Sequence, residues 1–134
     1  MINSEKEGSD IMKILLVDDD AMITELLSAR LVETGHCVEC AGNGWEAITK
    51  LSHNEYDLLI TDLMIPDISG LTLLSLLQSY LIGKVPVIII SSLDQPSTVL
   101  SGMGLGADDY FVKPINIQKL TTRINMLDTQ HGQA

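Results

Sequence analysis

The sequence is poor in basic and in aromatic residues. It has 8 Lys or Arg against 18 Asp or Glu, a formal net charge of −10, and only 4% aromatic residues. Cationic side chains carry binding to nucleic-acid phosphates and to anionic membrane surfaces, so the composition argues against both kinds of partner. The hydrophobic fraction of 46% still predicts one globular domain, with a core built from aliphatic side chains.

Long hydrophobic runs are absent as well. The longest apolar stretches, such as 85–90, are far shorter than the roughly 20 residues that a membrane-spanning helix needs. The first ten residues are polar and lack the apolar centre of a secretory signal peptide. We therefore expect a cytoplasmic protein.

Cysteine is scarce, and the two cysteines form the pair Cys37 and Cys40. A redox pair of this spacing normally lies at a helix N-terminus, whereas this pair lies in a strand-like segment whose residues i and i+3 point to opposite faces. Even with His36 as a third ligand, metal binding is disfavoured because no second such pair exists. We expect two reduced, partly buried thiols.

Short apolar runs alternate with longer amphipathic segments along the chain. Strands are predicted at 14–17, 37–41, 58–61, 87–90 and 109–112, and helices at 22–32, 45–51, 70–80, 97–105 and 117–127. Five such units with near-continuous apolar strands predict an α/β fold with a doubly wound, five-stranded parallel sheet. We expect a flexible N-terminal segment (1–12), one domain (13–128) and a polar tail (129–134).

Three of the predicted helices carry details that a structure can test. Residues 22–32 place Met22 and Leu26 among the apolar residues at helical spacing, and Gly35 is a plausible C-cap. The segment 45–51 puts Trp45 on one face with Ile48 and Leu51. The helix at 97–105 is predicted to be weak because it contains two glycines.

Polar residues stand where the apolar strands end. In an open parallel sheet the functional site lies beyond the carboxyl ends of the strands. The residues found there are Asp18, Asp19, Asp20, Asp62, Ser91, Ser92 and Lys113. Clustered carboxylates repel one another unless a cation such as Mg²⁺ is present, and lysine and serine suit a tetrahedral oxyanion. The pattern favours transfer of a phosphoryl group, although a single residue such as Asp20 can serve only as a helix N-cap.

Four motifs in order resemble the receiver domain of two-component response regulators, in particular single receivers of the chemotaxis-regulator type. They are ILLVDDD (14–20), DLLITDLMIP (57–66) with Gly70, PVIIISS (86–92) and GADDYFVKP (106–114). The resemblance covers about residues 13–127. It implies a flavodoxin-like (βα)5 fold with the strand order 2-1-3-4-5.

The resemblance also implies a phosphorylation site and a metal site. Asp62 would be the phosphorylated residue, in a Mg²⁺-dependent reaction. Asp19 and Asp62 would bind the ion directly, Met64 would contribute its backbone carbonyl, and Asp18 would act through water. The domain would be a signalling switch that assists only its own phosphorylation and dephosphorylation, and so would not be an enzyme.

Three further residues correspond to the switch machinery of the family. Lys113, followed by Pro114 and usually by a cis bond between them, would pair with the phosphoryl oxygens. Ser91 would be the hydroxyl that moves toward the phosphoryl group, and Tyr110 the aromatic residue that turns inward with it. Partners implied are a histidine kinase or phosphotransfer protein and a downstream protein target or effector domain, without direct nucleic-acid or membrane contact.

The sequence departs from the family pattern at a few positions. Ser92 replaces a usual alanine, and the apolar Met64 and Leu93 occupy positions that tune autodephosphorylation. Since neither can position an attacking water by hydrogen bonding, we expect a long-lived phosphoryl group. Some members of the family dimerise through the last two helices and the strand between them, using acids on the strand and bases on both helices. Asp109 and Arg123 fit part of this pattern, but no Lys or Arg lies between Leu93 and Gly106, so the bases of the fourth helix are missing. A weak homodimer is left open.

Two alternatives remain at this point. A haloacid-dehalogenase-like phosphatase would use Asp18 as its nucleophile, given the DxD spacing of 18–20, but Met22 and the absence of room for a cap domain count against it. A phosphorylation-independent pseudo-receiver usually lacks one of the acids or the lysine, and all are present here. Whether the chain acts alone or belongs to a larger regulator or hybrid kinase is open.

Overall fold

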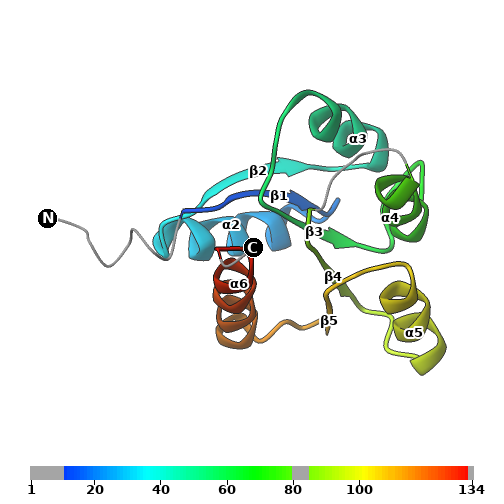
Figure 1. The fold of residues 1–134 in the computed structure, drawn as a ribbon. Helices are drawn as coiled ribbons and strands as arrows, with labels where there is room; N and C mark the ends of the chain where they lie inside the picture. Colours follow the sequence, from blue (N-terminus) through cyan, green and yellow to red (C-terminus); the bar gives the residue numbers. More distant parts are fainter. Residues whose placement is uncertain (1–10, 80–84, 133–134) are drawn as a thin grey trace, which may run out of the picture.

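The structure, a computed structural model, describes residues 11–79 and 85–132, and for residues 128–132 it describes the backbone alone. In this part of the chain five strands and five helices alternate (Figure 1). The strands are β1 (Lys13–Val17), β2 (Cys37–Ala41), β3 (Leu58–Asp62), β4 (Val87–Ser91) and β5 (Asp109–Val112). The helices are α2 (Ala21–Glu33), α3 (Gly44–His53), α4 (Gly70–Ser79), α5 (Pro96–Gly104) and α6 (Ile117–Gly132).

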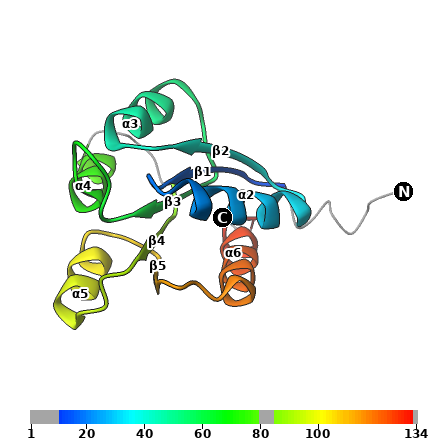
Figure 2. The same ribbon diagram turned by 180° about the vertical axis from the view of Figure 1, so that it is seen from behind.

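The strands form one parallel sheet in the order β2-β1-β3-β4-β5. Helices α2 and α6 lie on one face and α3, α4 and α5 on the other, as Figures 1 and 2 show from opposite sides. The predicted fold class, the doubly wound parallel sheet and the strand order are confirmed.

The hydrophobic core consists of two clusters, one on each face of the sheet. Along β1, Ile14 and Leu16 pack with α2 and α6, whereas Leu15 and Val17 pack with α3 and α4. Strands β1, β3 and β4 are covered on both faces, which explains why they read as unbroken apolar runs. This double cover holds the carboxyl ends of the central strands rigidly beside one another.

Helix starts follow from local hydrogen bonds. Asp20 caps α2, because its side chain accepts from the Met22 amide at 2.9 Å, and Gly35 follows the helix with a φ of 99°. Asn43 caps α3 by accepting from the Glu46 amide at 2.8 Å. The helix-cap interpretation of Asp20 is therefore confirmed.

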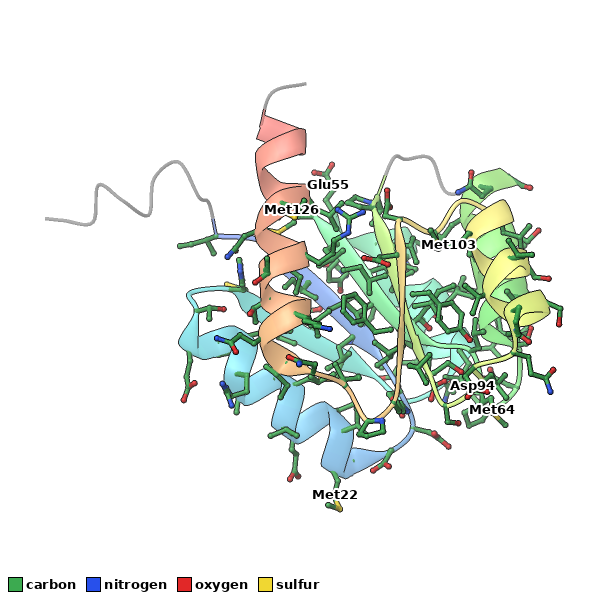
Figure 3. The ribbon with its side chains drawn as sticks, turned by 90° about the horizontal axis from the view of Figure 1, so that it is seen from below. Met22, Glu55, Met64, Asp94, Met103 and Met126 are labelled. Atoms are coloured by element: carbon green, nitrogen blue, oxygen red, sulfur yellow. The ribbon has the colours of Figure 1, made fainter. Side chains whose placement is uncertain are left out.

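Expectations about apolar helix faces were only partly right. On α2, Leu27 is buried in the protein core, but Met22 is 78% exposed and Leu26 is 52% exposed. Figure 3 shows Met22 pointing away from the molecule. Trp45 is 59% exposed, although Ile48 of the same helix packs against the core. Met22 and Trp45 are each the second residue of their helix and lie in its first turn.

The prediction that the cysteines are partly buried is wrong. Cys37 and Cys40 are both exposed free thiols. They lie on β2, which is the edge strand next to β1 and is covered less completely than the central strands. Edge position depends on strand order and cannot be inferred from the local sequence.

The limits of some elements differ from those predicted. The predicted helix at 70–80 corresponds to α4 up to Ser79, and residue 80 lies outside the described residues. Helix α5 forms despite Gly102, whose added Cβ would lie 2.6 Å from Ile89 Cδ1, so the glycine permits close packing on β4. Helix α6 continues to Gly132, into the residues assigned to the tail, and Met12 is buried although it was assigned to the N-terminal segment. None of the helices in the described part of the chain has the length and apolar character needed to span a bilayer.

Candidate functional site

Asp18, Asp62 and Lys113 meet at the carboxyl edge of the sheet. Strands β1 and β3 are neighbours with Val17 opposite Thr61, which sets Asp18 and Asp62 side by side at the strand ends. The Lys113 ammonium, from the end of β5, lies 2.8 Å from Asp18 Oδ2 and 2.8 Å from Asp62 Oδ2. The structure thus brings together one residue from each of three predicted strand ends.

The two carboxylates are held by their own backbone turns. Asp18 Oδ1 accepts the Asp20 amide at 2.9 Å, and Asp62 Oδ1 accepts the Met64 amide at 3.1 Å. In each case the second oxygen is the one that contacts Lys113. Each of the two aspartates therefore uses one carboxylate oxygen for its own backbone turn and the other for the Lys113 ammonium.

Burial strengthens these interactions. Asp18 is 3% and Asp62 is 6% exposed. Burial lowers the pKa of Lys113, but its hydrogen bonds to Asp18 and Asp62 and their charges outweigh this effect and hold the pKa above the ordinary value. Lys113 is therefore a fixed positive charge at neutral pH.

A second group links Ser91 to Tyr110. Ser91 ends β4 and is fully buried, and its Oγ accepts the Leu93 amide at 3.1 Å. The Tyr110 hydroxyl donates to the Leu93 carbonyl at 2.6 Å. The backbone of Ser91 also accepts the Lys113 amide at 2.8 Å, so the three residues of the predicted switch belong to one connected network. The Lys113–Pro114 bond is cis, as the resemblance implied.

The remaining predicted metal ligands lie at the same edge. Asp19 and Met64 are exposed, and in the described residues no three His, Cys, Asp or Glu side chains are grouped as a metal cluster. The donor chemistry nevertheless fits Mg²⁺, since Asp18, Asp19 and Asp62 supply three carboxylates against one ammonium. The surplus negative charge and the oxygen ligands are what a hard divalent cation requires.

The loop after β3 contains a residue that the sequence analysis did not single out. Asp67 has a φ of 70°, which is uncommon for a residue other than glycine. Its carboxylate contacts the start of α3. An aspartate directly after Pro66 is a turn signal, but nothing local indicates that the amides donating to it are 22 and 23 residues away. The loop is closed by the Gly70 amide, which donates to the Leu63 carbonyl at 2.9 Å.

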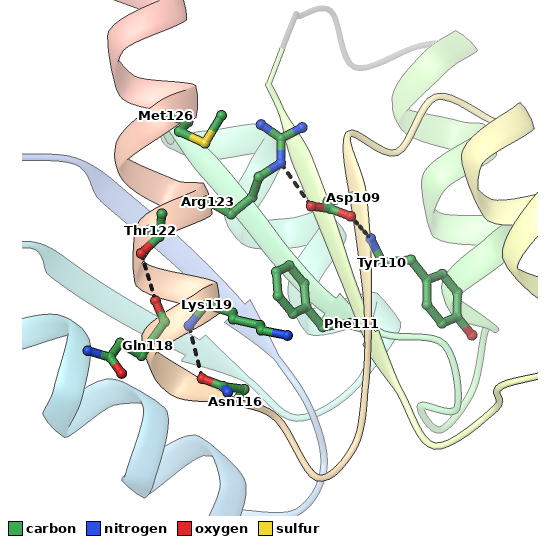
Figure 4. A pocket seen from close by; sticks show the side chains of 9 residues that line it. All are labelled: Asp109, Tyr110, Phe111, Asn116, Gln118, Lys119, Thr122, Arg123 and Met126. Atoms are coloured by element: carbon green, nitrogen blue, oxygen red, sulfur yellow. Dashed lines mark hydrogen bonds and ion pairs between the residues drawn. The ribbon is translucent and has the colours of Figure 1, made fainter.

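A groove of about 510 Å³ lies between β5 and α6 (Figure 4). Within it Arg123 Nε lies 2.8 Å from Asp109 Oδ2, and an Arg123 guanidinium nitrogen also donates to the Asp108 carbonyl at 3.0 Å. The acid and base that fitted part of a dimerisation scheme are therefore paired within one chain.

Comparison with known proteins identifies the family. A model of the response regulator receiver domain matches residues 14–125. The chain is 40% identical over 117 residues to the probable transcriptional regulatory protein SilR of Salmonella typhimurium and 38% identical to the two-component response regulator PhoP of Pseudomonas aeruginosa. Each match covers 87% of this chain, and 50% and 51% of those relatives.

A solved structure agrees with this result. The receiver domain of the Francisella response regulator 1452 superimposes with a TM-score of 0.85 at 35% identity, covering 90% of this chain and 98% of that one. The chain spans about half the length of the curated relatives that it matches. Neither the fold nor these comparisons support a haloacid-dehalogenase-like phosphatase or a pseudo-receiver. The chain belongs to the response regulator receiver domain family of two-component signalling.

Proposed function

We propose that the chain accepts a phosphoryl group on Asp62 from the phosphohistidine of a kinase or phosphotransfer protein, with Mg²⁺, and thereby switches its output surface. The observation that carries the proposal is the placement of the Lys113 ammonium 2.8 Å from both buried carboxylates, Asp18 and Asp62. A buried acid beside a fixed cation, at the carboxyl edge of a parallel sheet, is suited to hold a transferred phosphoryl group.

The reaction forms one P–O bond and breaks one P–N bond. A carboxylate oxygen of Asp62 attacks phosphorus, and the bonding electrons return to the imidazole nitrogen of the donor. Lys113 pairs with the phosphoryl oxygens, and the Ser91 hydroxyl donates a hydrogen bond to one of them. Because Asp62 and Lys113 are held together before the reaction, catalysis rests on positioning and charge neutralisation.

Magnesium would be held by Asp19, Asp62 and the Met64 carbonyl, with Asp18 acting through water, and it would neutralise charge on the phosphoryl oxygens. The assignment of these ligands is what the resemblance to the family implies, and the surplus of carboxylates over ammonium groups at the site supports a divalent cation. The domain turns over no separate substrate in this account.

The switch uses the connected network. When Ser91 donates to the phosphoryl group, its Oγ no longer has the same geometry toward the Leu93 amide. Leu93 is also the acceptor of Tyr110, so a shift of the loop after β4 moves the aromatic side chain on β5. The surface formed by α5, β5 and α6 is therefore the proposed output face.

The unit that carries this function is proposed to be residues 13–128, acting in the cytoplasm. Its upstream partner would be a histidine kinase or phosphotransfer protein. Because the matching relatives are about twice as long and are named as regulators, the downstream partner would be a protein target or an effector domain. With a net charge of −10, direct contact of this domain with nucleic acid or membrane is not expected.

Phosphoimidazole tests the donor chemistry, because its P–N bond is that of phosphohistidine. The protein is incubated with phosphoimidazole and Mg²⁺, and its intact mass is compared with that of Asp62→Asn. We expect the added mass of one phosphoryl group in the parent only, and no added mass when EDTA is present. Equal labelling of both proteins would contradict the assignment of Asp62.

A further inference from the structure

The loop that follows Asp62 is tied to a helix on another part of the chain. Asp67 Oδ1 accepts the Gly44 amide at 2.8 Å, and Oδ2 accepts the Trp45 amide at 3.3 Å. The Pro66 carbonyl also accepts the Gly44 amide at 3.4 Å. One short segment of the loop therefore contacts the first two residues of α3, about 22 positions earlier in the chain.

These contacts complete the hydrogen bonding at the start of α3. The first amides of a helix have no partners within the helix itself. Asn43 accepts the Glu46 amide, whereas the amides of Gly44 and Trp45 are bound by Asp67. The helix dipole adds a favourable interaction with the carboxylate. Asp67 thus supplies a second cap, which comes from the loop and not from the helix.

The backbone shows that Asp67 is held in place. Its φ of 70° lies in the left-handed region, which costs free energy for any residue with a side chain. Its Oδ1 also accepts the Ile68 amide at 2.6 Å. A side chain at position 44 would not fit, because a Cβ there would lie 2.9 Å from Asp67 Oδ1 and closer still to Ile68. The contact between loop and helix is therefore close and specific.

The same loop carries Met64, whose backbone carbonyl is the proposed metal ligand. At its base the loop is fixed by the Met64 amide on Asp62 Oδ1 and by the Gly70 amide on the Leu63 carbonyl. Ile65 anchors the middle of the loop in the core. Beyond Ile65, the contact of Asp67 with α3 holds the tip.

We propose that Asp67 is a positioning residue for the Mg²⁺ site: by binding the amides of Gly44 and Trp45 it fixes the loop so that the Met64 carbonyl is directed toward the metal. This inference rests on the proposed function, because it requires Mg²⁺ at Asp62. It adds α3 to the elements that control the site. It assigns no direct contact between Asp67 and the metal or the phosphoryl group.

Four variants test the proposal. Asp67→Gly removes the carboxylate and with it the contact to α3. Glycine adopts a positive φ without steric strain, so the backbone at position 67 is not destabilised by the change. Asp67→Asn removes the charge but keeps one acceptor oxygen. Gly44→Ala displaces the loop from the helix side and changes no charge. Asp94→Asn is the control, since it removes an exposed carboxylate from the loop after β4, at the same edge of the sheet.

The measurement is the Mg²⁺ dissociation constant by titration calorimetry, with the thermal unfolding midpoint recorded for each variant. We expect about tenfold weaker binding in Asp67→Gly and Gly44→Ala, a smaller loss in Asp67→Asn, and less than about a twofold change in Asp94→Asn, as for groups that orient metal ligands. A purely structural role would change the unfolding midpoint and leave the dissociation constant unchanged.

The outcomes separate this inference from the proposed function. If the parent binds Mg²⁺ and folded Asp67→Gly and Gly44→Ala bind it equally well, the positioning role is wrong and the proposed function stands. If Asp94→Asn weakens binding as much as Asp67→Gly, the effect is one of charge and the positioning role is again wrong. If the parent itself binds no Mg²⁺, both proposals fail.

Discussion

The Tyr110 hydroxyl donates a 2.6 Å hydrogen bond to the backbone carbonyl of Leu93, and the amide of the same Leu93 donates to Ser91 Oγ. One residue of the loop after β4 therefore connects a buried hydroxyl beside the acidic site to a half-buried aromatic ring on β5. Through these two hydrogen bonds, a movement of Ser91 can displace Tyr110, which lies on the surface formed by α5, β5 and α6.

Removal of the Tyr110 hydroxyl is expected to loosen this loop. In Tyr110→Phe, hydrogen exchange of the amides at 92–95 should be about two- to tenfold faster, since one hydrogen bond typically contributes about 0.5–1.5 kcal/mol. Tyr56→Phe is the matched control, because its hydroxyl binds Glu39 at the opposite end of the sheet. Unchanged exchange at 92–95 in Tyr110→Phe would show that the contact does not restrain the loop.

Removal of Lys113 is expected to destabilise the fold. In Lys113→Met two buried carboxylates face each other without a cation, and we expect the free energy of unfolding to fall by roughly 2 kcal/mol. Adding Asp62→Asn should recover part of this loss, because the repulsion disappears. Urea denaturation followed by circular dichroism measures both effects. Equal stability of Lys113→Met and the parent would contradict the electrostatic description of the site.

Alkaline pH is expected to weaken the fold through Tyr56 and Lys113. Burial, followed by the hydrogen bond to Glu39, raises the pKa of Tyr56 well above its ordinary value of 10.0. The pKa of Lys113 is also raised. A raised folded-state pKa gives stability that is present below the unfolded-state pKa and is lost as pH rises above it. Stability should therefore decline above about pH 10.

The ultraviolet absorption of tyrosinate provides the direct measurement. In the folded protein Tyr56 should ionise well above the ordinary tyrosine pKa of 10.0. The decline of stability above pH 10 should be shallower in Tyr56→Phe, since one of the two contributions is absent. A parent whose three tyrosines all ionise together near their ordinary pKa, while still folded, would show that the Tyr56 contact with Glu39 has no energetic effect.

The fluorescence of the sole tryptophan, Trp45, is expected to respond to phosphorylation of Asp62. Trp45 is 59% exposed and its amide is bound by Asp67, so a movement of the loop after β3 reaches its surroundings. We expect its fluorescence to change on addition of acetyl phosphate and Mg²⁺, and not in Asp62→Asn. A change of the same size in Asp62→Asn would mean that the signal arises from something other than phosphorylation.

The phosphoryl group is expected to be long-lived. Met64 is 58% and Leu93 is 37% exposed, and both are apolar, so neither can orient an attacking water. Met64→Asn and Leu93→Glu should shorten the lifetime of the phosphorylated form severalfold, as followed by intact mass after removal of the donor. A parent that loses its phosphoryl group rapidly, with no change in either variant, would refute this expectation.

Much of the site was predictable from the sequence, because strand ends in a parallel sheet converge whatever the details of the helices. Asp18, Asp62 and Lys113 were placed together on this ground. Burial at helix starts and on edge strands was predicted less well. Trp45 has helical spacing with Ile48, but periodicity alone does not tell which residues in the first turn of a helix the core covers.

Asp67 shows a different limit of sequence reasoning. Its type and its place after Pro66 indicate a turn, yet its acceptor role depends on α3 lying beside the loop. That neighbourhood results from the packing of α3 and α4 on the same face of the sheet. Contacts of this kind, between elements distant in sequence, need the tertiary structure.

Phosphorylation of Asp62 would add the mass of one phosphoryl group, so the intact mass of the protein is the decisive measurement. The parent and Asp62→Asn are incubated with Mg²⁺ and acetyl phosphate, with EDTA and hydroxylamine as controls. We expect the gain of one phosphoryl group in the parent alone, absent with EDTA and reversed by hydroxylamine as for an acyl phosphate. No gain in the parent, or an equal gain in Asp62→Asn, would contradict it.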